Sequence, residues 1–258
     1  MSLEVKALFN ITGRVALITG GSSGVGQMIA RVFAANGARV YITGRNPERL
    51  AQAAAEMTSL GGQCIALEAN LSSMAGVDAL VREMAARESR LDILVNNAGA
   101  TWGAPIESFP EVGWDRVYDL NVKVPFFLTQ KLLPLLSAVA DGEHWGRVIH
   151  ISSVGARTAE PSAASYITSK AAVEQLTRVM ARGLAGHRIT VNAIAPGWFP
   201  SRMNAPIRES SGDTWLAATP HGRFGTAEDM GGLALFLCSR AGVYVNGQVI
   251  SLDGGRML

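Results

Sequence analysis

A tyrosine and a lysine lie four residues apart, at Tyr166 and Lys170, and Ser153 lies thirteen residues before the tyrosine. A free phenol has a pKa of about 10, so at neutral pH it is a poor proton donor and acceptor. A nearby ammonium favours the phenolate and lowers that pKa. Residues four apart share one face of a helix, and the flanking alanines favour a helix. We therefore predict that Lys170 lies beside Tyr166 and lowers its pKa, although this spacing also occurs by chance.

Size, composition and charge exclude several classes of function. The chain has 258 residues, 48% hydrophobic and 17% charged, with a net charge of +2 and no block of like charges. This composition predicts a globular core and no nucleic-acid partner. The four histidines and two cysteines have no metal-ligand spacing, so we expect no metal, and the cysteine content suits a reducing compartment. No apolar run approaches the roughly 18 residues of a membrane span, so we expect a soluble protein, and the cysteine usage favours a cytoplasmic location.

The strands and helices that position these residues are predicted from the alternation of short apolar runs with longer helix-like stretches. Short runs rich in Val and Ile alternate with longer helix-like stretches, which predicts a parallel sheet with helices on both faces. We predict one doubly wound, Rossmann-like α/β domain of seven strands over residues 1–258. The predicted strands are 15–19, 40–43, 64–69, 91–95, 147–151, 189–194 and 249–252. The predicted helices are 24–36, 47–60, 73–87, 162–184 and 227–238, with a long helical region over about 111–139.

A glycine-rich turn follows the first predicted strand. Gly20, Gly24 and Gly26 stand where the strand ends and the next helix begins. Glycine allows the backbone to turn sharply and approach a pyrophosphate, and the helix N-terminus offers free N–H groups. This context predicts a dinucleotide site rather than a Gly-Ser-rich surface loop. The predicted contacts in this turn are Gly20, Ser22, Ser23, Gly24, Val25 and Gly26.

An arginine, Arg45, follows the second predicted strand. NAD-binding folds of this kind usually carry an acidic residue here, which bonds the ribose 2′-hydroxyl. A guanidinium instead suits a 2′-phosphate in charge and geometry. The position therefore predicts NADP(H) as the cofactor, and the alternative is a solvated surface arginine.

Five motifs in one order resemble the short-chain dehydrogenase/reductase family, over about Thr12 to Gly255. They are Thr19-Gly-x-x-x-Gly-x-Gly26, Asn96-Asn97-Ala98-Gly99, Ser153, Tyr166-x-x-x-Lys170 and Pro196-Gly197. Within that family the chain is most similar to 3-oxoacyl-(acyl carrier protein) reductases associated with rhamnolipid synthesis. The segments that carry this nearer resemblance are 100–104, 132–136, 196–203 and 252–255.

The resemblance implies a catalytic tetrad of Asn121, Ser153, Tyr166 and Lys170. Tyr166 would donate a proton to the carbonyl oxygen that receives negative charge, and Ser153 would donate a hydrogen bond to it. Lys170 would bind the nicotinamide ribose, and Asn121 would hold a water that links Lys170 to solvent. The alternatives are a helix-interior role for Asn121 and a capping role for Ser153, with Ser152 as the competing serine.

The resemblance also implies further contacts to the dinucleotide. Asn70 stands where the family usually has an aspartate for the adenine amino group, and its amide oxygen can still accept that bond. Ser201 stands where the family often has a threonine near the carboxamide. The implied contacts beyond the glycine turn and Arg45 are Asn70, Leu71, Asn97, Ala98, Gly99, Tyr166, Lys170, Pro196, Gly197, Phe199 and Ser201.

The segment 198–224 reads as a long irregular substrate lid. Candidate walls of an apolar pocket are Thr101, Trp102, Val154, Gly155, Trp198 and Phe199, although the tryptophans suit packing equally well. Arg202 and Arg208 are either contacts to the phosphates of an acyl carrier or solvated side chains.

We expect an NADP(H)-dependent oxidoreductase that reduces a carbonyl of a small molecule, such as a 3-oxoacyl thioester, to a secondary alcohol. A dehydrogenase of a sugar acid, sterol or xenobiotic is an open alternative, because the tetrad works in both directions. A non-catalytic dinucleotide sensor is a further alternative, which the complete tetrad disfavours. The resemblance implies a homotetramer with contacts at 113–139 and 162–184.

Overall fold

The computed structural model describes residues 3–139, 144–201 and 205–258, and within them seven strands form one parallel sheet. Their order is β3-β2-β1-β4-β5-β6-β7, so the sheet grows from β1 first in one direction and then in the other. The predicted seven-stranded, doubly wound sheet is confirmed. The strands are β1 (Val15–Ile18), β2 (Arg39–Gly44), β3 (Gln63–Glu68), β4 (Ile93–Asn96), β5 (Gly146–Ile151), β6 (Ile189–Pro196) and β7 (Val249–Leu252).

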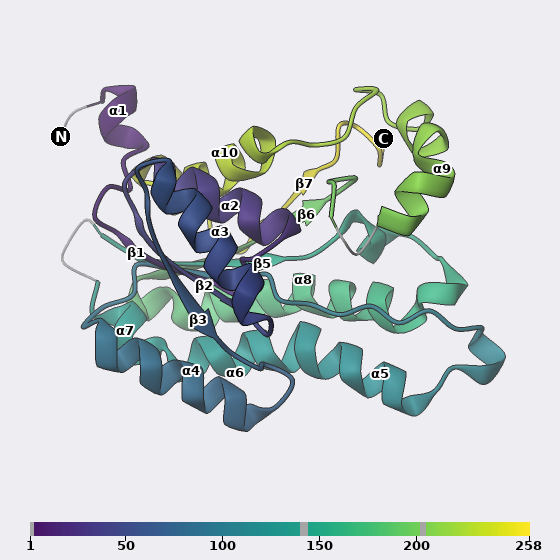
Figure 1. The fold of residues 1–258 in the computed structure, drawn as a ribbon, viewed down its shortest axis with the longest axis horizontal. Helices are drawn as coiled ribbons and strands as arrows, with labels where there is room; N and C mark the ends of the chain where they lie inside the picture. Colours follow the sequence, from purple (N-terminus) through teal and green to yellow (C-terminus); the bar gives the residue numbers. More distant parts are fainter. Residues whose placement is uncertain (1–2, 140–143, 202–204) are drawn as a thin grey trace.

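One face of the sheet packs against three helices that lie on the same side of it in Figure 1. Phe33, Met57 and Met230 from these helices form a buried cluster with strand residues such as Ile18 and Ile42. Burial of this apolar surface, at about 25 cal/mol per Å², stabilises the contact of helices and sheet. The helices are α2 (Gly24–Ala35), α3 (Pro47–Ser59) and α10 (Ala227–Cys238).

The opposite face packs against a second set of helices (Figure 1). Val77, Met84, Leu128 and Met180 form a separate buried cluster with the alternate strand residues, among them Leu17. Both faces are thus buried, which explains why the strands are apolar without alternation. The helices that supply this cluster are α4 (Met74–Arg87), α6 (Val124–Lys131) and α8 (Ala164–Leu184).

The long helical region predicted over about 111–139 is present, but it is divided into several pieces. The structure has α5 (Glu111–Tyr118), a π-helical turn η2 (Asp119–Lys123), α6 and a short α7 (Leu133–Ser137). Pro134 lies in the first turn of α7, and a proline cannot donate the N–H that would continue α6. Apolar residues run through all of these pieces, so periodicity alone could not separate them.

The irregular segment predicted over 198–224 is also corrected, because it contains the helix α9 (Ala205–Ala217). Pro206 stands in the first turn, where its missing N–H costs little. Arg202 and Met203 lie outside the described residues, as do the side chains of Ile207 and Arg208. A short helix α1 (Val5–Leu8), which the sequence did not predict, precedes β1.

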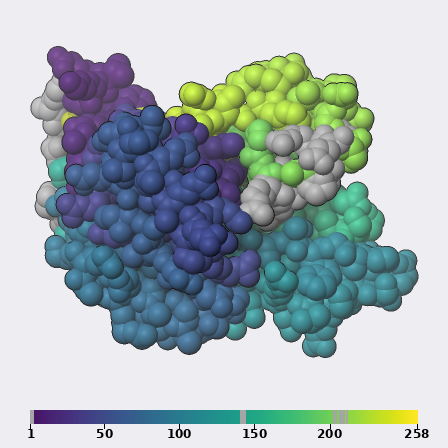
Figure 2. Space-filling model, viewed as in Figure 1, coloured from purple at the N-terminus to yellow at the C-terminus, as the bar shows by residue number. Residues whose placement is uncertain are grey.

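The loops that follow β1, β4, β5 and β6 meet at the carboxyl edge of the sheet. β1 and β4 are neighbours in the sheet, although β2 and β3 separate them in the sequence. In such sheets ligands bind in the crevice at this change of direction. Figure 2 shows the surface hollowed between the blue N-terminal half and the teal region of α5. No described helix is both long and apolar enough to cross a membrane.

Candidate active site

Ser153 and Tyr166 meet although they come from different elements. Ser153 lies two residues beyond the end of β5 in extended backbone, and its Oγ accepts a hydrogen bond from the Gly155 N–H at 3.0 Å. Tyr166 lies in the first turn of α8. A Cβ added at Gly155 would lie 3.2 Å from Ser153 Oγ and 3.9 Å from Tyr166 Cε1, so the serine hydroxyl and the phenol ring are close together. The strand and the helix therefore bring together the serine and the tyrosine that the sequence singled out.

Burial and hydrogen bonding act on the pKa of Tyr166 in opposite directions. Burial raises this pKa above its ordinary value, and the hydrogen bond with Ser153 opposes the rise only in part. Lys170 Nζ lies 5.7 Å from the centre of the Tyr166 ring, but it donates a hydrogen bond to the Ile151 carbonyl at 2.7 Å. The net pKa of Tyr166 is thus raised, because loss of water around the phenol is the largest effect. The lowering by Lys170 stays a prediction.

Lys170 is itself buried, with 5% of its surface exposed. Burial lowers the pKa of Lys170 to about 8, because the charged ammonium loses contact with water. A side chain with such a pKa can accept or release a proton near neutral pH.

Ser152, the competing serine, is engaged elsewhere. It is buried, and its Oγ donates to the Lys170 carbonyl and to Glu174 Oε1, each at 3.3 Å. Its hydroxyl therefore attaches the end of β5 to α8, which leaves Ser153 as the serine beside Tyr166.

Asn121 lies on the π-helical turn η2 and is buried. Its Oδ1 accepts from the Ala100 N–H at 2.8 Å, and its Nδ2 donates to the Ala100 carbonyl at 3.0 Å and to Ser169 Oγ at 2.9 Å. A Cβ added at Gly99 would lie 3.2 Å from Asn121 Oδ1 and 3.7 Å from Lys170 Nζ, so these groups are close together. The amide thus ties the loop after β4 to α8, and the water relay stays a prediction.

The turn after β1 has the geometry of an anion cradle. Gly20 and Gly24 have φ values of 65° and 56°, which favour glycine. A Cβ at Gly26 would come within 2.4 Å of Asn97 Nδ2, so this position has no room for a side chain. The Ser23 side chain makes no capping bond to α2. Open N–H groups and close-packed glycines fit the pyrophosphate of a dinucleotide.

Thr19 and Asn97 hold this turn against β4. Thr19 Oγ1 accepts from the N–H groups of Asn97 and Ala98, at 3.0 and 2.9 Å. Asn97 Nδ2 donates to the carbonyls of Thr19 and Gly20, at 2.8 and 3.1 Å. The sequence missed Thr19 as a site residue, although it opens the glycine motif. Asn97 was predicted to line the adenine ribose, and its amide N–H groups are used to position the glycine turn.

Arg45 is exposed, and no other described residue forms an ion pair or hydrogen bond with its side chain. It borders a cavity of about 580 Å³ that also reaches the other side of the crevice at α5. A free guanidinium at the end of β2 fits a 2′-phosphate. The lining residues are Arg45, Ser72, Gly99, Ala100, Thr101, Glu111, Val112, Asp115, Arg116, Asp119 and Leu120.

Asn70 is less available for adenine than the sequence predicted. Its Oδ1 accepts from the Ser72 N–H at 3.2 Å and from Ser72 Oγ at 2.7 Å. These two bonds use the lone pairs that an adenine amino group would need. The adjacent Leu71 is buried in the core.

The loop after β6 lies next to the glycine turn. A Cβ at Gly24 would lie 3.2 Å from Ser201 Cβ, and one at Gly197 would lie 2.7 Å from Asp253 Cβ. Pro196 ends β6 and pairs with Leu252. Phe199 is buried, and its ring fills the space beside Gly225. Ser201 and Gly24 are thus brought together, as a shared cofactor site requires.

Of the candidate pocket walls, some line the cavity and others pack against neighbouring helices. A Cβ at Gly113 of α5 would lie 2.6 Å from the Trp102 ring, so this ring packs on α5 rather than standing open to the pocket. Thr101 borders the cavity beside α5. Trp198 stacks on Trp215 of α9, with ring centres 3.4 Å apart. Packing therefore accounts for two of the tryptophans that the sequence left open.

Comparison with protein families and known proteins agrees with this geometry. A family model described as Enoyl-(Acyl carrier protein) reductase matches residues 20–256. The chain is 46% identical over 250 residues to the rhamnolipid biosynthesis 3-oxoacyl-[acyl-carrier-protein] reductase of Pseudomonas aeruginosa, covering 96% of this chain and 97% of the relative. It is 37% identical to a gluconate 5-dehydrogenase of Gluconobacter oxydans, covering 96% of each chain.

Two solved structures show the same fold. A Pseudomonas aeruginosa structure described as an RhlG/NADP active-site complex superposes with a TM-score of 0.93 at 46% identity, covering 98% of this chain and 99% of the other. A 7α-hydroxysteroid dehydrogenase, described as complexed with NADH and 7-oxo glycochenodeoxycholic acid, has a TM-score of 0.91 at 33% identity, and 98% of each chain is covered. The common fold thus serves carbonyl groups of different compounds.

Proposed function

Because the chain belongs to the short-chain dehydrogenase/reductase family, we propose that it is an NADP(H)-dependent oxidoreductase that reduces the ketone of a 3-oxoacyl thioester to a secondary alcohol. The observation that carries this proposal is the meeting of Ser153, Tyr166 and Lys170 beside the glycine turn. The name of the relative at 46% identity supports the 3-oxoacyl substrate.

The side chains have distinct roles in this reaction. The nicotinamide, when bound, supplies a hydride to the carbonyl carbon. Tyr166 donates its proton to the carbonyl oxygen, and its raised pKa keeps the phenol protonated before the reaction. Ser153 donates a hydrogen bond to the same oxygen as negative charge develops there. Lys170 and Asn121 complete the proposed tetrad, with Lys170 binding the nicotinamide ribose.

The cofactor is NADP(H), and the residues proposed to hold it follow from the site. The glycine turn binds the pyrophosphate, and Arg45 pairs with the 2′-phosphate. A neighbour at 46% identity is described as an NADP complex, as is one described as a gluconate 5-dehydrogenase. The adenine contact of Asn70 is weak in this proposal, since Ser72 already occupies its amide oxygen.

The direct test is an NADPH oxidation assay with a short 3-oxoacyl thioester, such as acetoacetyl-coenzyme A. We expect turnover of the thioester to exceed that of a 5-keto sugar acid and of a 7-oxo bile acid, assayed at equal concentrations. A strong preference for the sugar acid or the sterol would replace the substrate class while keeping the reaction. No turnover of any ketone, with tight dinucleotide binding, would support a sensor instead.

The assembly and location are further parts of the proposal. A homotetramer is supported by exposed apolar side chains on the helices that the family resemblance implicates, Trp114 of α5 and Val179 of α8. A cytoplasmic location is supported by the two cysteines, which are both free. We treat the chain as one domain, in which the segment 198–224, with α9, closes over the substrate.

A further inference from the structure

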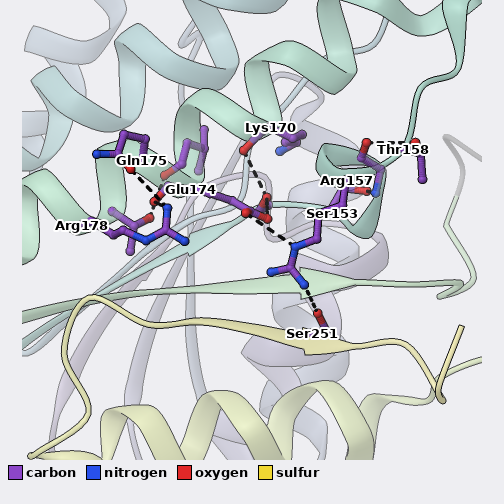
Figure 3. Close-up of polar contacts among 12 residues, drawn as sticks. Ser153, Arg157, Thr158, Lys170, Glu174, Gln175, Arg178 and Ser251 are labelled. Atoms are coloured by element: carbon purple, nitrogen blue, oxygen red, sulfur yellow. Dashed lines mark hydrogen bonds and ion pairs between the residues drawn. The ribbon is translucent and has the colours of Figure 1, made fainter. Parts of the chain in front are cut away.

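One carboxylate, Glu174, contacts the chain on both sides of Ser153. Its Oε1 accepts from Ser152 Oγ at 3.3 Å, and its Oε2 pairs with Arg157 Nε at 3.8 Å. Glu174 lies on α8, one turn beyond Lys170 and two turns beyond Tyr166. Figure 3 shows its side chain between the end of β5 and Arg157. The carboxylate therefore connects the residues before and after Ser153 to α8, the helix that carries Tyr166 and Lys170.

Arg157 extends the connection to a second element. It ends the short 3₁₀ helix η3 (Val154–Arg157), which Ser153 caps, and its Nη1 donates to Ser251 Oγ of β7 at 2.8 Å. The backbone bonds that shape η3 stay within the loop: Gly155 N–H donates to Ser153 Oγ, Ala156 N–H to the Ser153 carbonyl, and Thr158 N–H to the Gly155 carbonyl. Arg157 is therefore the side chain that ties the far end of the loop to both α8 and the sheet (Figure 3).

The ion pair of Glu174 and Arg157 joins a mostly buried side chain to a partly exposed one. The Glu174 side chain is 11% exposed and that of Arg157 is 39% exposed. An ion pair of this kind adds little to the stability of a whole protein, but it can fix one geometry of a loop. The position of the serine matters more, because a displacement of about 1 Å at a reacting group can cost about a hundredfold in rate.

We propose that Glu174 and Arg157 are positioning residues, which act on the reaction by holding Ser153 in place beside Tyr166. Neither residue touches the proposed dinucleotide site. Loss of either should therefore lower kcat and leave the KM for NADPH unchanged. This inference rests on the proposed function, since Ser153 must contribute to carbonyl reduction.

The test compares Glu174→Gln, Arg157→Met and the double variant, each with and without Ser153→Ala, in the acetoacetyl-coenzyme A assay. We expect each single variant to lower kcat about tenfold, the double variant to be no worse than either, and neither change to matter further in the Ser153→Ala background. Arg157→Met removes a partly exposed side chain, so it remains informative if Glu174→Gln folds poorly.

A second ion pair provides the control. Arg39 and Glu88 also form an ion pair between a partly exposed arginine and a mostly buried glutamate, with side chains 48% and 10% exposed. Arg39 begins β2 and Glu88 follows α4, so the pair lies at the amino edge of the sheet, away from Ser153. Glu88→Gln and Arg39→Met should leave kcat unchanged. Wild-type kcat in Glu174→Gln and Arg157→Met, or an equal further loss in the Ser153→Ala background, would overturn the positioning role. Wild-type kcat in Ser153→Ala would instead contradict the proposed function.

Discussion

Lys170 places an ammonium where the protein shields it from water. Its Nζ donates a hydrogen bond to the Ile151 carbonyl, and burial lowers its pKa to about 8. The pKa of an unfolded lysine is 10.5, so between these two values the unfolded chain binds more protons than the folded chain. The folded state therefore gains stability as pH rises from about 8 to about 10.5, and the full cost of burial is present below pH 8.

The first prediction concerns this linkage. Relative to Lys170→Met, the wild type should gain about 2 kcal/mol in free energy of unfolding between about pH 7 and about pH 10. Urea unfolding of both proteins at the two pH values measures the difference, and other titrating groups cancel between them. A difference that stays constant with pH would show that Lys170 has an ordinary pKa in the folded protein.

The second prediction concerns Arg45. Arg45→Ala should raise the KM for NADPH by about 10- to 100-fold, because a charge-assisted bond to the phosphate is lost, and should leave the KM for NADH nearly unchanged. Arg82→Ala, which removes an exposed arginine from the middle of α4, is the control. An equal effect on both dinucleotides would mean that Arg45 does not recognise the 2′-phosphate.

The elements explain which parts of the site the sequence could predict. Tyr166 and Lys170 share a helix, so their spacing alone predicts that they lie on one side of α8. Ser153 and the glycine turn follow strands whose ends meet at one edge of a parallel sheet, which the alternating pattern also predicts. The fold and the meeting of these residues were therefore accessible without coordinates.

Other features depend on contacts that no local pattern encodes. The π-helical turn at Asp119–Lys123 lies within a stretch that the sequence predicts as one helical region. The bonds of Asn97 to the glycine turn, of Asn70 to Ser72 and of Lys170 to Ile151 join groups whose polar atoms have several possible partners. The pKa of Tyr166 depends on the depth of its burial, which spacing does not reveal.

The third prediction belongs to the π-helical turn. Asn121→Ala should lower the free energy of unfolding by about 2 to 4 kcal/mol, because it leaves the buried N–H and carbonyl of Ala100 without their partner. Asn96 is a matched control: it is also buried, but its Nδ2 bonds Thr129 while its Oδ1 has no partner among the described residues. Asn96→Ala should cost less in the same denaturation experiment. Equal losses in the free energy of unfolding would show that the two bonds from Asn121 to Ala100 add no stability beyond that of any buried asparagine.

At the scale of the whole molecule, large apolar side chains on α5 and α8 are exposed to water, which is unfavourable for an isolated chain. Val179 of α8 is 58% exposed and Trp114 of α5 is 38% exposed, and Trp114 stacks on Tyr118 with ring centres 5.1 Å apart. Contiguous exposed apolar surface commonly marks contacts between proteins. Packing of α5 and α8 against a second copy would bury these side chains beside the elements that carry Asn121 and Tyr166.

The fourth prediction tests this assembly. Val179→Glu should convert the proposed homotetramer to a smaller species in light scattering, because a carboxylate would be buried at the interface. Leu60→Glu is the control, since Leu60 is 63% exposed at the end of α3, away from α5 and α8. A wild type that is monomeric, or a Val179→Glu protein of unchanged mass, would contradict the predicted interface.

The central claim is that Tyr166 gives its proton to a carbonyl oxygen, and Tyr166→Phe tests it most directly. This change removes only the hydroxyl, so NADPH binding measured by fluorescence should be retained. The kcat for NADPH-dependent reduction of acetoacetyl-coenzyme A should fall by about 10²- to 10⁴-fold, the usual contribution of a general acid. A Tyr166→Phe protein that binds NADPH and reduces the thioester at the wild-type rate would contradict the account.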